Sequence, residues 1–141
     1  MESLHYLLMK SHTLLNRKIL SQAMKLGYSP GQPKVLEYLS KYEGSDQKTI
    51  AAYCEIEQAT VGSILLRMEN TGLIERRQAQ GNRRSLYVYL TDKGRQAARD
   101  IAEVFAQADK TAEASLSPDE VMQLKMLLEK ISNTLNAEKE V

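Results

Sequence analysis

Two groups of side chains have the types and spacing that contact with a nucleic acid requires, and both lie between residues 58 and 84. The first group is small or polar, and it consists of Gln58, Ala59, Thr60, Ser63 and Arg67. In a helix these residues fall away from the apolar residues of the same segment, because side chains three and four positions apart share a face. Small and polar side chains on such a face can enter the major groove of DNA and reach base edges.

The second group is cationic and surrounds a predicted β-hairpin. It consists of Arg76, Arg77, Arg83 and Arg84, with only Glu75 against them. Arginines at a hairpin tip can lie along a phosphate backbone or enter a narrow minor groove. A merely solvated face is the alternative, but it does not need so dense a cluster. We expect Arg76, Arg83 and Arg84 to contact DNA, and Gln47 to anchor a phosphate from the start of the preceding helix.

Hydrophobic periodicity places these side chains on two helices and a hairpin. The first helix carries Ile50, Ala51 and Cys54 on one face, and Ile56 lies in the turn that follows. The second helix has apolar residues at i, i+3, i+4 and i+7, which are Val61, Ile64, Leu65 and Met68. Gly72 ends it, and strands are predicted over residues 73–77 and 86–90, around a loop over residues 78–85. This order predicts a winged helix-turn-helix, in a mainly α fold with a small β-hairpin.

Three stretches of the chain resemble the MarR (multiple-antibiotic-resistance regulator) family. They are SPGQPKVLEYL at residues 29–39, ATVGSILLRMENTGLIERR at residues 59–77 and NRRSLYVYLTDKG at residues 82–94. The likeness covers nearly the whole chain, including a long helix before the core and two after it. It implies a homodimeric bacterial transcription factor that binds double-stranded DNA through a winged helix-turn-helix and is often released by a small molecule or an oxidant. We therefore expect a repressor that binds a pseudo-palindromic operator as a homodimer.

The sequence departs from the family pattern at the wing and at the turn. Ala79 and Asn82 stand where the family usually has Asp, so that Arg83 lacks its customary carboxylate partner. Glu55 replaces a frequent Gly, and Glu57 replaces the usual Ser or Asp cap, which makes a poorer N-cap. Both glutamates lie near the positive end of the helix dipole, but they repel a nearby phosphate.

The flanking segments are predicted to be long amphipathic helices that pair with a second copy of the chain. The first spans residues 3–26, and Pro30 is predicted to begin the helix after it; Ser117 caps the last helix. Their apolar stripes are too long for a small winged core to bury. A monomeric helical cap is the alternative. The expected dimer contacts are Leu4, Leu8, Leu15, Leu124, Leu128 and Ile131.

Length and composition agree with one domain, residues 1–141, in which residues 29–99 form the winged core and residues 1–28 and 100–141 the dimerisation helices. No apolar run reaches the ~20 residues that span a bilayer. The first residues lack the pattern of a signal peptide, so we expect a cytoplasmic protein without a membrane partner. The net charge of +1 hides an asymmetry, because residues 1–99 carry +6 and residues 100–141 carry −5. The basic part contains the expected DNA-binding unit.

Other classes of function find little support in the residues. The two His, both in the first helix, and the single Cys do not have the spacing of a Ser-His-Asp or Cys-His catalytic group. The sequence also has no Gly-rich phosphate-binding loop. We therefore expect neither an enzyme nor a cofactor. Cys54 is interpreted as a small buried hydrophobe rather than a redox sensor. His5 and His12 are two helical turns apart without further ligands, so no metal site is predicted. The alternative function is a winged-helix module that binds protein or a small molecule but not DNA.

A small aromatic or anionic ligand is the remaining expected partner, as the family resemblance implies. Its cleft would lie between the first two helices and the helix that begins near residue 91. The residues predicted to line this cleft are Tyr6, Met9, His12, Tyr38 and Tyr42. Such residues more often form ordinary core, which is the alternative interpretation.

Overall fold

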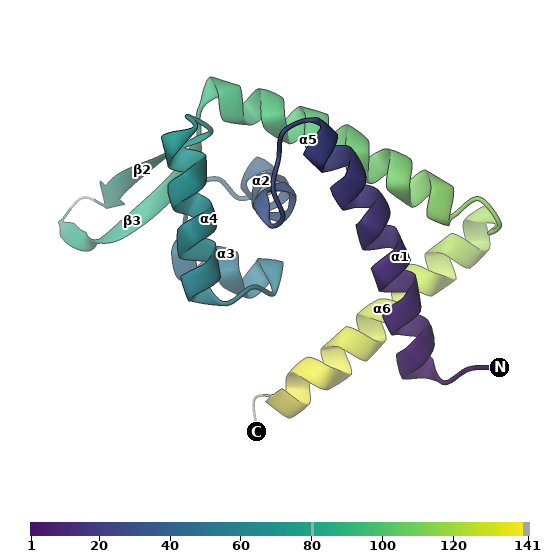
Figure 1. Ribbon diagram of the computed structural model, residues 1–141. Helices are drawn as coiled ribbons and strands as arrows, with labels where there is room; N and C mark the ends of the chain where they lie inside the picture. Colours follow the sequence, from purple (N-terminus) through teal and green to yellow (C-terminus); the bar gives the residue numbers. More distant parts are fainter. Residues whose placement is uncertain (80, 140–141) are drawn as a thin grey trace.

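The computed structural model describes residues 1–79 and 81–139, without the side chains of residues 79, 82–85 and 139. The described residues form six helices and three strands, and the helices and the two hairpin strands follow the predicted order (Figure 1). The helices are α1 (Leu4–Lys25), α2 (Gln32–Lys41), α3 (Gln47–Cys54), α4 (Gln58–Asn70), α5 (Asp92–Ala112) and α6 (Pro118–Lys139). The strands are β1 (Ser45–Asp46), β2 (Ile74–Ala79) and β3 (Asn82–Leu90). The expected mainly α fold with a small hairpin is confirmed.

The start of α2 corrects a sequence-based expectation. Pro30 does not begin this helix; it lies in a turn that the Gln32 amide closes on the Ser29 carbonyl oxygen at 3.2 Å. The helix begins at Gln32, and Pro33 occupies its first turn. The preference for proline at the start of a helix fits both Pro30 and Pro33, because proline is tolerated wherever the backbone N–H has no partner within the helix.

The helix-turn-helix is made by α3 and α4, as the sequence predicts. The Asp46 carboxylate caps α3 by accepting a hydrogen bond from the Thr49 amide at 2.8 Å, and bonding to Thr49 lowers the pKa of this carboxyl. Glu55 ends α3 in the left-handed backbone conformation, with φ of 55°, which residues other than glycine rarely adopt. Glu57 precedes α4 without making a side-chain capping bond, in agreement with its expected weakness as a cap.

The sheet differs from the predicted hairpin in two respects. A third strand, β1, pairs antiparallel with β3, so the strand order is β1-β3-β2. The two hairpin strands also run further than predicted, because β2 reaches Ala79 and β3 begins at Asn82. The loop expected over residues 78–85 is therefore mostly strand. Gly81, with φ of 82°, allows this tight reversal of the chain.

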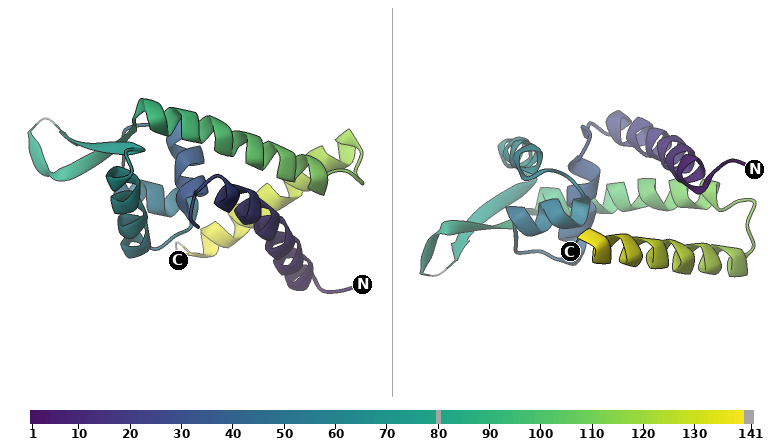
Figure 2. Two further views of the ribbon diagram at one scale, coloured as in Figure 1. Left: turned by 45° about the horizontal axis from the view of Figure 1, so that its top comes forward. Right: turned by 90° about the horizontal axis from the view of Figure 1, so that it is seen from below.

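The core lies where α2, α3, α4, the sheet and the first half of α5 meet, and it contains the apolar stripe predicted for α4. Its largest fully buried side chains are Val35, Leu36, Leu39, Ile50, Val61, Leu65, Met68, Val88 and Ile101. In Figures 1 and 2, α1 and the second half of α5 extend away from this winged core, whereas α6 turns back from the end of α5 toward it. Asn136 of α6 shares a hollow with residues of α3 and the start of α4. None of the described residues of α6 is buried.

The Leu-Thr-x-x-Gly sequence after the hairpin joins three elements. The Thr91 hydroxyl caps α5 by accepting from the Gly94 amide at 3.0 Å, and it donates to the Gly72 carbonyl at 2.6 Å. The Thr91 amide donates to the Leu73 carbonyl oxygen at 3.1 Å. This oxygen lies against Gly94, where a Cβ atom would approach it to 1.9 Å. The motif thus fixes the direction of α5 relative to the end of α4.

A carboxylate ties the end of α2 to the hairpin and to α5. One Glu43 oxygen accepts from the Leu90 amide at 2.8 Å and from the Arg95 guanidinium at 3.1 Å. Arg95 also donates to the Leu90 carbonyl oxygen at 3.1 Å. Charge-assisted hydrogen bonds of this kind are stronger than neutral ones, so this cluster holds the wing in a fixed position beside α2.

Candidate nucleic-acid interface

The second helix of the helix-turn-helix, α4, presents one face to solvent between α3 and the hairpin. Val61, Leu65 and Met68 are buried on its inner face. Counting 100° per residue, the opposite face consists of Ala59, Ser63, Leu66 and Asn70, and all four are exposed. A face of small and uncharged side chains on an exposed helix has the shape needed to enter a major groove.

The predicted readers of α4 are all exposed, but they do not all point the same way. Ala59 and Ser63 lie at the centre of the outer face, and the Ser63 hydroxyl contacts the Ala59 carbonyl oxygen at 3.4 Å. Thr60 lies at the edge toward α1, where it lines a hollow. Arg67 donates a hydrogen bond to the Ser29 hydroxyl at 3.0 Å, across to the turn between α1 and α2. Arg67 is therefore partly engaged within the chain.

Gln47 holds α3 and α4 together. Its side-chain amide donates to the Gln58 carbonyl oxygen at 2.9 Å, and this amide lies 3.0 Å from the position of a Cβ on Gly62. One amide hydrogen is used in this bond, which leaves only the second for a phosphate. The structure thus assigns Gln47 a bracing contact that the sequence did not predict.

Arg76 and Arg77 of the hairpin are less available for contact with DNA than the sequence implies. The Arg76 side chain is only 18% exposed, and its Nε lies 3.8 Å from a Glu69 oxygen on α4. Arg77 pairs with Glu75 and stacks over the Tyr89 ring at 4.1 Å. Arg76 thus faces inward beside α4, because residues 74 and 76 share the face of β2 that covers the core, and its expected role as a DNA contact is not supported by this position. The side chains of Arg83 and Arg84 lie outside the described residues.

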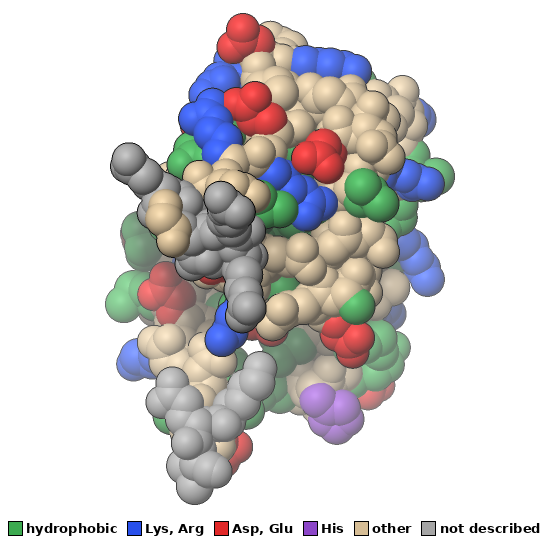
Figure 3. Space-filling model, turned by 90° about the vertical axis from the view of Figure 1, so that its left-hand side faces the viewer, with side chains coloured by type: hydrophobic (Ala, Val, Ile, Leu, Met, Phe, Trp, Pro, Cys, Tyr) green, Lys and Arg blue, Asp and Glu red, His purple; other side chains and the backbone are tan. Residues whose placement is uncertain are grey.

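The charge on this side of the molecule is mixed. Figure 3 faces the hairpin and α4, and it shows Lys and Arg side chains interspersed with Asp and Glu across the part that the structure describes. Leu66, which the sequence reasoning missed, adds a large apolar side chain to the outer face of α4, where it is 53% exposed. The signal was present in the spacing, because Leu66 follows Ser63 by three positions and Ala59 by seven.

A mostly apolar hollow of about 370 Å³ lies between α1, α2, α4 and α5. Its lining includes His12 and Ile19 of α1, Lys34 of α2, Ile64 of α4 and Phe105 of α5. It agrees in place with the cleft expected between the first two helices and α5. The lining differs from the prediction, because only His12 of the five predicted residues contributes to it.

The other four residues lie elsewhere for identifiable reasons. Tyr38 is buried, with its hydroxyl 2.8 Å from the Ser45 hydroxyl. Its ring packs against Tyr42 and Tyr53, with centroids 5.2 and 4.8 Å apart, in an aromatic cluster shared by α2 and α3. Tyr6 and Met9 lie nearer the N-terminal end of α1 than the hollow. These four residues therefore lie outside this hollow.

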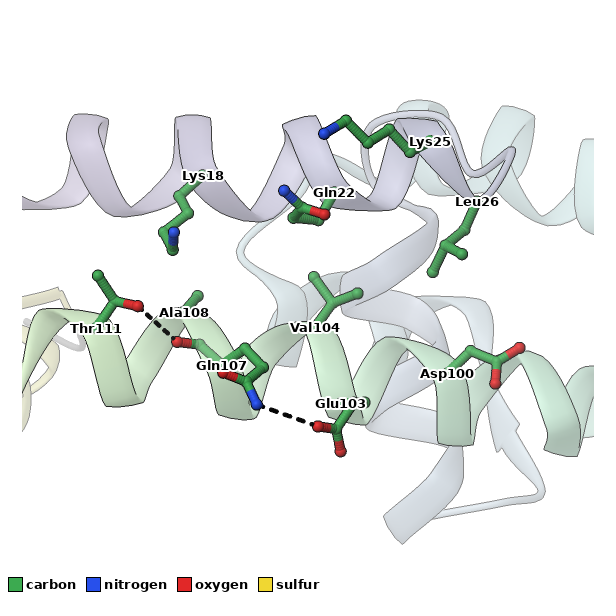
Figure 4. Close-up of a pocket in the computed structure, with 10 residues that line it drawn as sticks. All are labelled: Lys18, Gln22, Lys25, Leu26, Asp100, Glu103, Val104, Gln107, Ala108 and Thr111. Carbon is green, nitrogen blue, oxygen red and sulfur yellow. Dashed lines mark hydrogen bonds between the residues drawn. The ribbon is translucent and has the colours of Figure 1, made fainter.

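A second hollow, of about 490 Å³, separates α1 from α5 (Figure 4). Lys18 and Lys25 lie on α1, and Asp100 and Glu103 lie on α5. In Figure 4 these charged groups point in different directions rather than toward one point. Glu103 accepts instead from Gln107 of the same helix at 3.4 Å. The hollow therefore lacks convergent polar groups, which a ligand site needs in order to orient its ligand.

Cys54 is buried on the inner side of α3. Burial raises the pKa of its thiol to about 11, against a smaller opposing effect from Lys34. A thiol with such a pKa is protonated at neutral pH and reacts slowly, which agrees with its interpretation as a small hydrophobic residue. Among the described residues, no three His, Cys, Asp or Glu side chains gather as a metal site would require, and no described helix has the length and apolar character needed to cross a membrane.

Comparison with known proteins identifies families and proteins to which this chain is similar. Residues 26–85 match the MarR family. Over 94 residues the chain is 33% identical to the HTH-type transcriptional regulator MgrA of Staphylococcus aureus, a match that covers 66% of this chain and 62% of MgrA. Over 104 residues it is 32% identical to the uncharacterised HTH-type transcriptional regulator YkoM of Bacillus subtilis, covering 74% of this chain and 68% of YkoM.

The fold agrees with a solved structure over nearly the full length. A MarR family regulator from Listeria monocytogenes, solved in complex with a 26mer DNA, superposes with a TM-score of 0.90. The superposition covers 98% of this chain and 92% of the Listeria chain, at 19% sequence identity. The chain therefore belongs to the MarR family. Membership of a family of transcriptional regulators agrees with the expectation that the chain is not an enzyme.

Proposed function

We propose that this chain is a cytoplasmic transcriptional regulator that binds double-stranded DNA at a specific operator and acts as a repressor. The observation that carries the proposal is the exposed outer face of α4, a helix that the Gln47–Gln58 hydrogen bond ties to α3. The Listeria relative of the same fold was solved with DNA, which supports the assignment of this face. In this arrangement α4 enters the major groove, and the hairpin lies over the neighbouring backbone.

The proposed assembly is a homodimer that binds a pseudo-palindromic site. Leu4 and Leu8 of α1, and Leu124 and Leu128 of α6, are exposed although they form apolar stripes. Leu15 and Ile131 continue the stripes as half-buried residues. A second copy of the chain covers such stripes through a two-fold axis, and the same axis then repeats the DNA half-site. The two α4 helices must lie about 34 Å apart to meet successive turns of the major groove.

The wing supplies contacts to the DNA backbone in this proposal, through Arg83 and Arg84 at its tip. The test is to recover duplexes from a random pool and then to titrate one of them at several salt concentrations. Arg83→Ala should weaken binding to the selected duplex and to a scrambled one alike, and reduce the slope of log affinity against log salt by about one unit, because one fewer phosphate counterion is released. Arg99→Ala, which removes the same charge from α5, should leave the slope unchanged.

An unchanged salt slope for Arg83→Ala would remove the wing from the proposed interface. Thr60 and Ser63 are assigned to base edges, so alanine at either position should change the preference among operator variants rather than the salt slope. A lost base contact of this kind costs about 1–3 kcal/mol for the matching base pair. Recovery of no duplex at all would contradict the proposed function as a whole.

The apolar hollow between α1, α2, α4 and α5 is proposed as the site of a small regulatory ligand. Its volume of about 370 Å³ lies in the range of small-molecule pockets. His12 and Lys34 can donate to a carboxylate, while Ile64 and Phe105 offer apolar contact to an aromatic ring. Because the hollow touches Thr60 and Ile64 of α4, an occupant would bias the position of the helix that reads DNA.

A thermal-shift screen of aromatic carboxylates tests the ligand proposal. A ligand at about 100 times its Kd adds about 2.7 kcal/mol to the free energy of unfolding, which raises Tm by several degrees. Ile19→Phe, which places a larger side chain in the lining, should abolish the shift, whereas Leu14→Phe, on the exposed side of α1, should retain it. A screen without any stabilising compound would count against a regulatory ligand of this class.

The alternative is a winged-helix module that binds a protein or a small molecule without DNA. Two observations favour it: Glu55 and Glu57 place negative charge at the N-terminus of α4, and the side chains of Arg76 and Arg77 are paired with glutamates. The random-pool selection separates the two functions, because this alternative predicts that no duplex is enriched.

A further inference from the structure

The outer face of α4 has an unusual composition for a helix that reads DNA. Ala59, Ser63 and Leu66 are its exposed side chains over the first nine residues. None of them carries charge, and the first cation that follows, Arg67, is bonded to Ser29. Guanine is most often read by a bidentate Arg or Lys, and adenine by a bidentate Asn or Gln. The centre of this face offers none of these side chains before Asn70.

Leu66 is the largest side chain on this face, and it is 53% exposed. The core stripe of α4 passes through Val61, Leu65 and Met68, so Leu66 points away from it. Many of the other exposed leucines lie in α1 and α6, where they belong to the stripes assigned to a second copy of the chain. Leu66 lies on the winged core instead, on the same face as Ala59 and Ser63. Its apolar surface is therefore placed to meet the DNA that α4 is proposed to read.

The major groove offers one apolar group on its base edges, the C5-methyl of thymine. We propose that Leu66, together with Ala59, recognises thymine methyl groups, so that the operator carries A·T pairs at the positions that face the centre of α4. Ser63, between them, can donate or accept a hydrogen bond and tolerates several bases. Specificity then comes from burying methyl groups against apolar side chains, and not from a charged reader of guanine. The inference rests on the proposed function and names the kind of sequence that it requires.

Replacing thymine by uracil in the selected duplex tests this inference, because the exchange removes the methyl group and keeps the base pairing. Each A·T position is changed in turn, and affinity is measured for the full-length protein and for Leu66→Ala. The unaltered protein should lose about 4-fold in affinity at each contacted methyl, the equivalent of one buried methyl group. Leu66→Ala should lose nothing further at the positions that Leu66 contacts and should stay sensitive at any that Ala59 contacts, so that the two changes are coupled at the former positions in a double-mutant cycle.

Leu26→Ala provides the matched control. Leu26 is 50% exposed, close to the 53% of Leu66, but it lies at the end of α1. This variant should respond to uracil as the unaltered protein does. Exposed leucines contribute little to folding, so circular dichroism of both variants should match that of the unaltered protein.

The possible outcomes separate this inference from the proposed function. Recovery of no duplex contradicts DNA binding itself. If a duplex is bound but tolerates uracil at every position, or if Leu66→Ala keeps the full sensitivity to uracil, the thymine-methyl contact is wrong while the regulator remains. Uracil sensitivity that disappears in Leu66→Ala and persists in Leu26→Ala supports the contact.

Discussion

Gly94→Ala is expected to prevent folding or to lower the free energy of unfolding by several kcal/mol. A Cβ on this residue would lie 1.9 Å from the Leu73 carbonyl oxygen and 3.0 Å from its carbon. Both atoms belong to the backbone, and the oxygen already accepts from the Thr91 amide, so neither can move without separating α5 from the hairpin. Overpacking usually costs about 1–3 kcal/mol, and a clash with fixed backbone exceeds that range. Urea unfolding followed by circular dichroism measures the loss.

Gly27→Ala is the matched control for this prediction. Gly27 has a positive φ of 93°, but no atom lies within 4 Å of the position that its Cβ would occupy. Only backbone strain opposes this substitution, which costs about 1–2 kcal/mol for a residue with a side chain. The prediction fails if Gly94→Ala unfolds at the same urea concentration as Gly27→Ala.

The order of elements could be predicted from the sequence because the long elements repeat with clear periods. Val61, Leu65 and Met68 indicate the buried face of α4 without ambiguity, and all three are fully buried. Strand β1 could not be found in this way, because two residues are too few to show a period of two. Its pairing with Val88 and Tyr87 depends on a contact more than forty residues away in the sequence. The longer hairpin was missed because polar residues such as Gln78 look like a loop.

The chemical types of the site residues could be predicted, but their partners could not. Gln47, Arg67 and Arg76 are polar and lie on or beside the expected interface, as the sequence implies. Each also makes a contact within the chain: Gln47 with Gln58, Arg67 with Ser29, and Arg76 with Glu69. The periodicity of the sequence does not distinguish a side chain that is free to contact DNA from one that hydrogen-bonds to a neighbouring helix, because both are polar and lie near the surface.

The predicted ligand cleft illustrates the same limit. The sequence shows which residues belong to α1 and α2, and the hollow does lie between these helices and α5. Which of their side chains face it depends on how the helices cross. Tyr38 points instead toward α3, where its hydroxyl finds Ser45 and its ring meets Tyr53. The tyrosines predicted from α1 and α2 therefore do not line the hollow, whereas Phe105 of α5 does.

Leu128→Glu is expected to break the proposed dimer. Leu128 lies in the apolar stripe of α6, a helix in which no described residue is buried by the rest of its own chain. A second copy that covers this stripe would bury the introduced carboxylate without a partner, and an unpaired buried charge costs several kcal/mol at least. Light scattering after gel filtration should give about twice the chain mass of 15.9 kDa for the unaltered protein and 15.9 kDa for the variant.

Asn133→Glu adds the same charge to the opposite side of α6 and should remain dimeric, which shows that the loss comes from the stripe and not from the net charge. DNA binding provides a second readout, because a monomer engages one half-site only and loses the avidity that two linked half-sites provide. The Leu128→Glu protein should therefore bind a palindromic duplex no better than a single half-site, while its circular dichroism still reports a folded winged core. A stable monomer of 15.9 kDa for the unaltered protein would overturn the dimer, and with it the expectation of a palindromic operator.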